Sequence, residues 1–207
     1  MLAKLIVHAD SREEAVSRMH NALDTLRVYG VTTNRSYIES LFESKAYLDA
    51  KLFTHMLDGF HPAENAIEVL DGGIQTTVQD YPGMVGYWVV GVPPLGPMDS
   101  YSFRLGNAVL GNDEDAAGLE LTMRGGSYRF RCDCWFCVAG ADMSATIDDK
   151  PIARLTATRA NHGDVLRFGA AAEGMRSYLL VKGGFDVPVI LGSRSTFIDG
   201  RFGGVNG

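Results

Sequence analysis

The sequence predicts an α+β protein in which a short segment of one strand and helices, residues 1–62, precedes a mainly-β domain, residues 63–207. Glycine usage is the first observation behind this division. Only Gly30 and Gly59 lie in the first segment, whereas the other 22 of the 24 glycines follow residue 62. The second observation is the hydrophobic period, which changes there from helical spacing to short strand-like runs. We therefore expect two separately packed units with a boundary near residues 60–66.

The first segment is predicted to hold one strand and three helices. Residues 2–8 are rich in aliphatic side chains, which favours a short strand. Ser11 and Glu14 have the spacing of a capping box, and apolar residues follow them at helical period. A second helix is expected after Asn34, which can cap it, and a third over residues 49–60.

The second segment is predicted to consist of short strands around one helix. Asp99 and Gly111 are placed as the N-cap and the C-terminal cap of a helix over residues 100–110. Glycine, aspartate and proline turns separate the strand-like runs, so their regular spacing indicates a barrel or a sandwich. The runs cover residues 66–73, 75–81, 87–92, 127–140, 144–148, 164–170 and 176–184.

Composition excludes several functional classes. The net charge of −6 offers no basic surface for nucleic acid. No apolar run is long enough to cross a membrane, and the N-terminal residues turn acidic too early for a secretory signal. Three cysteines, an odd number, indicate free thiols in a reducing compartment. We expect a cytoplasmic enzyme, with a mitochondrial one left open.

The cysteines are predicted to be structural. Alternation along residues 127–140 places Cys132 and Cys134 on one face of a strand and Cys137 on the other. A zinc site needs about four ligands that converge from turns. The five histidines are scattered without the spacing of a ligand pair. We therefore expect no metal site.

Several polar residues are not fully explained by strands and caps. Each still has a structural role available. Asp80 and Asp142 can end strands through Asx-turns, and Asp99 can cap its helix, which contributes about 1 kcal/mol. Asn107 can face solvent. Pattern alone favours the structural role for any one member of the set, which is Gln79, Asp80, Asp99, Asn107, Glu120, Asp142 and Arg194.

Long stretches of the second segment together resemble one family. They include "GGIQTTVQDYPG", "GYWVVGVPPLGPMDSYSFRLGN", "VAGADMSATID", "RSYLLVKGGFDVP" and "LGSRSTF". Over residues 66–207 the sequence resembles the carboxyltransferase region of urea carboxylase, the family whose stand-alone members are second subunits of allophanate hydrolase. Residues 1–62, through "AKLIVHADSREEAV" and "GVTTN", are similar to the C-terminal end of a biotin carboxylase domain. Such a fusion is typical of urea carboxylase and urea amidolyase.

The resemblance implies a fold and a reaction. Residues 63–207 are expected to form a cyclophilin-like β-barrel behind the αβ tail of a biotin carboxylase domain. The reaction implied is the transfer of CO₂ from carboxybiotin to urea, which gives allophanate. The catalytic residues implied are Asp80, Asp99, Asn107 and Glu120, and those that bind urea or biotin are Gln79, Gly96, Met98, Asp142 and Arg194.

The resemblance also implies partners. Biotin is carried on another domain, and ATP and Mg act only through the remainder of the biotin carboxylase. Urea, the biotin carrier domain and a second carboxyltransferase half are the expected partners, because the family forms its site between two halves. We therefore expect this chain to be part of a longer protein, truncated at its C-terminus and inactive when isolated.

Two positions depart from the family pattern. Met84 stands where the family usually has arginine, and Leu95 where it usually has serine. Lost donors beside the "GPMD" turn would weaken the site. Three alternatives stay open: a stand-alone binding or regulatory subunit, a subunit of the allophanate hydrolase or oxoprolinase type, and an inactive remnant. Related ureido or guanidino compounds also stay open as substrates.

Overall fold

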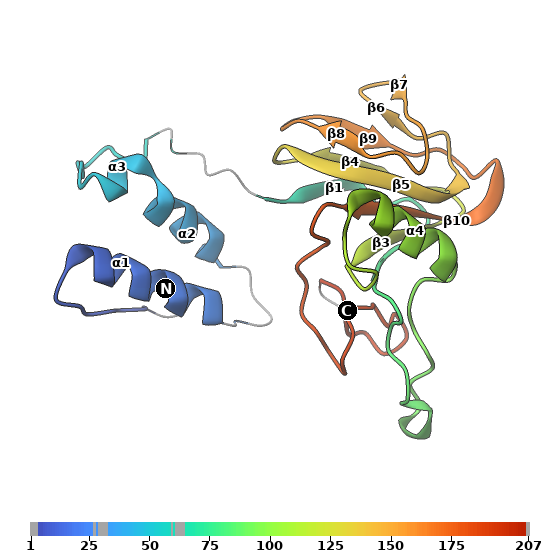
Figure 1. Ribbon diagram of the computed structural model, residues 1–207, viewed down its shortest axis with the longest axis horizontal. Coiled ribbons are helices and arrows are strands. Elements are labelled where there is room, and N and C mark those ends of the chain that lie inside the picture. Colours follow the sequence, from blue (N-terminus) through green and yellow to red (C-terminus); the bar gives the residue numbers. More distant parts are fainter. Residues whose placement is uncertain (1–3, 27, 29–32, 59, 61–64, 206–207) are drawn as a thin grey trace. The chain divides into compact units, whose positions relative to one another are not determined.

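The computed structural model describes residues 4–26, 28, 33–58, 60 and 65–205. The chain divides into two compact units, residues 1–64 and 65–207, which we treat separately (Figure 1). Gly30 and Gly59, the two glycines of the first segment, lie outside the described residues. The boundary near residues 60–66 stays a prediction.

The described residues of the first unit form three helices, α1 (Arg12–Thr25), α2 (Arg35–Glu43) and α3 (Lys45–Leu48). The predicted N-cap of α1 is confirmed, because Ser11 Oγ accepts a hydrogen bond from the Glu14 backbone N–H at 3.2 Å. The Glu14 carboxylate pairs with Arg18 on the next turn. Asn34 precedes α2 as predicted, although its side chain makes no capping bond. No helix in the described ranges is long and apolar enough to span a bilayer.

Two predictions for this unit are wrong. Residues 4–8 form no strand, and the described part of the unit holds no other strand whose backbone could pair with them. The third helix covers Lys45–Leu48 instead of residues 49–60, which contain turns. Ser44 begins this helix by accepting from the Tyr47 N–H, and Ala50, at φ 55°, takes a left-handed conformation just after it.

The second unit is built from two antiparallel sheets of five strands each. The first sheet has the order β1 (Ile67–Asp71), β4 (Ser127–Phe130), β9 (Val165–Arg167), β6 (Thr146–Ile147) and β7 (Lys150–Pro151). The second has the order β2 (Thr76–Gln79), β3 (Gly118–Thr122), β10 (Glu173–Val181), β5 (Cys134–Asp142) and β8 (Thr158–Ala160). The mainly-β prediction is confirmed, and the cyclophilin-like assignment stays a prediction.

The second sheet is buried on both faces. One face packs on the first sheet through a cluster that joins Tyr128 and Phe130 to Phe136 and Leu179. The other face is covered by α4 (Ser100–Leu110), as Figure 1 shows. This helix packs closely because Gly106 has no side chain: a Cβ there would lie 2.4 Å from Leu180 Cδ1. The buried residues at the contact between this helix and the sheet are Phe103, Leu110, Cys137, Ala139, Tyr178 and Leu180.

The strand predictions were partly right. Residues 127–140 form two strands, β4 and β5, rather than one. The predicted faces of β5 are confirmed, because Cys134 packs on the cluster between the sheets and Cys137 lies under α4. Residues 87–92 were wrongly predicted as a strand. They contain a 3-10 helix, η1 (Trp88–Val90), whose apolar side chains are exposed instead of buried against a sheet.

Candidate functional site

The candidate site lies where the turn before α4 meets a polar part of the second sheet. Thr77, Glu120 and Tyr178 stand directly opposite one another on the neighbouring strands β2, β3 and β10. Side chains paired in this way point to the same face of a sheet. This face therefore presents a row of polar groups beside the apolar residues that α4 covers.

This row holds the backbone of the turn over residues 96–99. Three N–H groups of the turn donate to three buried side chains: Gly96 to Gln79 Oε1 at 3.2 Å, Met98 to Glu120 Oε2 at 2.7 Å, and Asp99 to Tyr178 Oη at 2.7 Å. Each of the strands β2, β3 and β10 contributes one acceptor. The sheet thus holds the turn through three backbone hydrogen bonds, and Gly96 within it adopts a φ of 126° that favours glycine.

Glu120 is the centre of this network. Its Oε2 accepts a second hydrogen bond, at 2.9 Å from the Tyr178 hydroxyl, and its Oε1 lies 3.2 Å from Arg176 Nε. Burial, followed by the nearby Glu120 carboxylate, raises the pKa of Tyr178, so this hydroxyl keeps its proton and acts as a donor. Both oxygens of the Glu120 carboxylate therefore contact protein groups. The role of Glu120 is to stabilise the turn.

Arg176 and Tyr178 were missed by the sequence analysis. The available signal was period-two alternation in the run over residues 176–184, which places both side chains on one face. A charged residue in such an apolar strand is also unusual. Neither feature shows which residue on another strand is the partner.

Within the turn the Met98 side chain is exposed, Pro97 is buried and Asp99 is half-buried. Asp99 Oδ1 accepts from the Ser102 N–H at 3.0 Å, which confirms the predicted N-cap of α4. Nothing in the described part of the chain donates a hydrogen bond to Asp99 Oδ2. Met98 and Tyr101 are 72% and 74% exposed. The half-buried Asp99 therefore keeps one carboxylate oxygen without a donor among the described residues, close in the chain to two large exposed side chains.

Asp80 does not form the Asx-turn that we predicted. Its Oδ1 accepts from the hydroxyls of Ser193 and Ser195, and its Oδ2 accepts from the Arg194 N–H at 2.7 Å. These partners lie more than a hundred residues away along the chain, so no local pattern could indicate them. Asp80, although it directly follows β2, therefore fixes the loop over residues 193–195.

Asn107 is fully buried instead of solvent-facing. Its Nδ2 donates to the Ala116 carbonyl at 3.0 Å, and its Oδ1 accepts from Asn112 Nδ2 at 3.0 Å. Both groups hold the loop after α4. Arg194 lines a cavity of about 490 Å³ beside that same loop. The 11 residues of α4 separate this end of the helix from Asp99 by about 16 Å.

Asp142 lies in a third place. Its Oδ1 accepts from the Ser144 N–H at 2.8 Å, which confirms the predicted Asx-turn at the end of β5. It lines a separate cavity of about 470 Å³. The structure thus brings together five of the predicted site residues, and it places the side chains of Asp80, Asn107, Asp142 and Arg194 elsewhere. The five are Gln79, Gly96, Met98, Asp99 and Glu120.

Met84 and Leu95, the two residues that depart from the family pattern, contact each other. The Leu95 N–H donates to the Met84 carbonyl at 3.0 Å, and Met84 is 1% exposed. Gly83, at φ 85°, lets the two segments approach, since a Cβ there would collide with the Leu95 carbonyl. Met84 therefore packs inside the loop that leads into the turn.

The cysteines offer no preformed metal site. Within the described ranges, no group of three or more His, Cys, Asp or Glu side chains is placed to hold a metal ion. Burial, with Cys132 nearby, raises the pKa of Cys134 to about 11, and burial raises the pKa of Cys137 to about 11. Both thiols are protonated at neutral pH, whereas the thiolate is the form that binds metal.

We expect purified protein to contain no stoichiometric zinc. The reason is that Cys134 and Cys137 lie on opposite faces of β5 and hold their protons. Elemental analysis after refolding with and without excess zinc tests this. One zinc per chain that survives dialysis against a weak chelator would contradict the structural assignment of the cysteines.

Comparisons with known proteins match two family models to two parts of the chain. The family model described as "Carboxyltransferase domain, subdomain A and B" matches residues 90–207, and that of the "Biotin carboxylase C-terminal domain" matches residues 1–59. The urea amidolyase of Lachancea kluyveri is 45% identical over 206 residues, which are 100% of this chain and 11% of that protein.

Solved structures and a shorter relative extend the comparison. The crystal structure of the Kluyveromyces lactis urea carboxylase has a TM-score of 0.91 and 45% identity, covering 97% of this chain and 18% of that one. A 5-oxoprolinase subunit of Escherichia coli is 36% identical over 141 residues, 68% of this chain and 45% of the relative. The chain thus spans a small part of the urea amidolyases that it resembles. It belongs to the carboxyltransferase family, and its first 59 residues match the end of a biotin carboxylase.

Proposed function

We propose that this chain supplies one side of the site at which a biotin-dependent urea carboxylase transfers CO₂ from carboxybiotin to urea. The observation that carries the proposal is the turn over residues 96–99, whose N–H groups are held by Gln79, Glu120 and Tyr178. Small polar substrates need such fixed groups, because catalysis of group transfer depends on orientation. Similarity to urea carboxylase over 97% of the chain supports the choice of reaction.

Asp99 is the residue that we assign to urea. Its Oδ1 is used by the helix cap, and its Oδ2 is free to accept an N–H of the substrate. A carboxylate oxygen is a strong acceptor for such a group. An accepted hydrogen bond orients urea and increases the electron density on the nitrogen that attacks CO₂.

The neighbouring residues have supporting roles. Gln79 and Glu120 act on the turn rather than on urea, because their side-chain oxygens are engaged with its backbone. Gly96 and Met98 form the surface beside Asp99, where exposed apolar area suits the ring and chain of biotin. Carboxybiotin, when bound, would supply the CO₂ and, once CO₂ has left, a base for the proton that the attacking urea nitrogen loses. Asp80, Asn107, Asp142 and Arg194 are left outside the transfer site.

Other parts are needed to close the site. Met98 and Tyr101 are exposed in this unit, and carboxyl transfer requires a site from which water is excluded. The second carboxyltransferase half and the biotin carrier domain are the partners that we propose for this surface. ATP and Mg act at the biotin carboxylase, whose C-terminal domain matches residues 1–59. A cytoplasmic location fits the free cysteines.

One alternative has a specific observation in its favour. The match to the 5-oxoprolinase subunit covers 141 residues of this chain at 36% identity. A role as a subunit that acts on a cyclic amide is therefore the second candidate. In that case the same turn would bind a lactam, and urea would not be a substrate.

A chimeric enzyme tests the proposal. Residues 1–207 replace the matching segment of the K. lactis urea carboxylase, and ATP-dependent incorporation of labelled bicarbonate into allophanate is measured. We expect urea-dependent incorporation by the chimera and none by the isolated chain. A chimera that makes carboxybiotin but never transfers CO₂ to urea would contradict the proposal, and 5-oxoproline turnover in its place would favour the alternative.

A further inference from the structure

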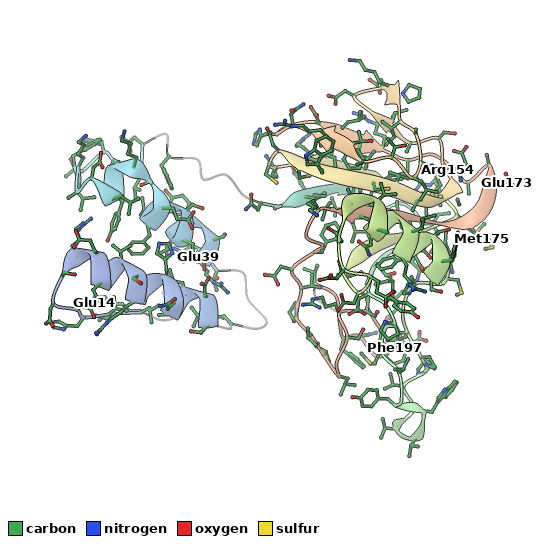
Figure 2. The ribbon with its side chains drawn as sticks, viewed as in Figure 1. Glu14, Glu39, Arg154, Glu173, Met175 and Phe197 are labelled. Atoms are coloured by element: carbon green, nitrogen blue, oxygen red, sulfur yellow. The ribbon has the colours of Figure 1, made fainter. Side chains whose placement is uncertain are left out.

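Arg176 is a partly buried charge that the proposed reaction does not yet use. The exposed start of β10, marked by Glu173 and Met175 in Figure 2, gives way to buried strand at this residue. The Arg176 side chain is 20% exposed, and that of Glu120 is 9% exposed. Arg176 Nε and Nη1 are both buried and have no hydrogen-bond acceptor among the described residues.

The contact between Arg176 and Glu120 is electrostatic. Nε and Oε1 are 3.2 Å apart, within ion-pair distance, but their direction is not that of a hydrogen bond. Burying a guanidinium group with unsatisfied donors is unfavourable, and such pairs are often no more stable than apolar replacements. Stability alone therefore does not account for Arg176. The role that is left for Arg176 is its electrostatic effect on the Glu120 carboxylate.

We propose that Arg176 is a positioning residue for the turn that carries the transfer site. This rests on the proposed function. The positive charge orients the Glu120 carboxylate, so that Oε2 receives both the Met98 N–H and the Tyr178 O–H. The Tyr178 oxygen then receives the Asp99 N–H. Arg176 acts through Glu120 and Tyr178 on the residue that orients urea, without touching the substrate.

Amide hydrogen exchange measures directly whether this series of contacts is formed. The Met98 and Asp99 amides donate to Glu120 and Tyr178, so their exchange rates measured by NMR report whether the turn is held. In Arg176→Met we expect both amides to exchange about tenfold faster, while amides between β5 and β8 keep their rates. Arg159→Met is the matched control, because Arg159 lies on the same sheet in an exposed ion pair with Asp133.

Arg176→Lys extends the test. Lysine keeps the charge but lacks the planar guanidinium, so we expect an increase of about threefold in the same two rates. If Arg176→Met does not fold, the exchange rates of Arg176→Lys are compared with those of the wild type instead. Equal acceleration of amides across the whole unit, or unchanged rates at Met98 and Asp99, would overturn the proposal.

A double-variant cycle shows whether the arginine acts through the carboxylate. In a Glu120→Gln background we expect Arg176→Met to change the Met98 and Asp99 rates less than about twofold. The same effect in both backgrounds would contradict positioning through Glu120. Urea-dependent transfer by the chimera is a separate readout. A loosened turn with undiminished transfer would support positioning and count against the proposed function, whereas a lower kcat with little change in the KM for urea supports both.

Discussion

Replacing Glu120 by alanine is expected to lower the free energy of unfolding of the β unit by about 3–5 kcal/mol, because it breaks a buried charge pair from one side. The substitution leaves the Arg176 guanidinium buried without its counter-ion. It also removes the acceptor of the Met98 N–H and of the Tyr178 hydroxyl. One substitution thus removes three contacts that hold the turn and the strand beneath it.

Guanidinium chloride denaturation followed by circular dichroism measures this change. Glu114→Ala is the control, since Glu114 forms an ion pair with Arg104 in which the side chains are 58% and 46% exposed. Such an exposed pair contributes about 0–1 kcal/mol. If Glu120→Ala costs no more than Glu114→Ala, Glu120 does not hold the turn.

Asp99→Asn is expected to slow urea-dependent transfer by the chimera about a hundredfold, as for other positioned groups at reacting centres. Asparagine caps helices as well as aspartate does, so the bond to the Ser102 N–H is retained. The oxygen that we assign to urea becomes an NH₂ group, which donates and cannot accept. Asp99→Ala loses the cap as well, which costs about 1 kcal/mol of stability.

This pair of variants separates catalysis from folding. Steady-state transfer rates and melting temperatures are measured for the chimera and both variants. We expect Asn and Ala to lose transfer to a similar degree, with a lower melting temperature only for Ala. Transfer losses that follow the melting temperatures instead would assign Asp99 to the helix cap alone.

Local signals in the sequence predicted local structure. The helix α4 was correct with both caps, because Asp99 and Gly111 mark its ends through their own conformational preferences. Strands with buried residues were also found, such as β2 and β10. The apolar run that became η1 was misread, because exposure of apolar side chains depends on what lies opposite them.

The site was predictable only in part, for the same reason. Gln79, Glu120 and Asp99 came from family resemblance, since pattern alone allowed each a structural role. Tyr178 contacts Asp99 across 79 positions of the chain and Glu120 across 58. Strand register creates these contacts, and it is set by the packing of the whole sheet. The identity of a single residue in one sequence does not indicate the strand register.

We propose the turn over residues 96–99, which the sheet holds, as the place where urea accepts CO₂. The most direct test of this proposal is single-turnover transfer from preformed carboxybiotin to urea in the chimera, which bypasses ATP and the biotin carboxylase. The wild-type chimera is predicted to transfer at a rate that depends on urea, and Asp99→Asn to be about a hundredfold slower with an unchanged melting temperature. Equal rates for the two proteins would contradict the assignment of Asp99 to urea.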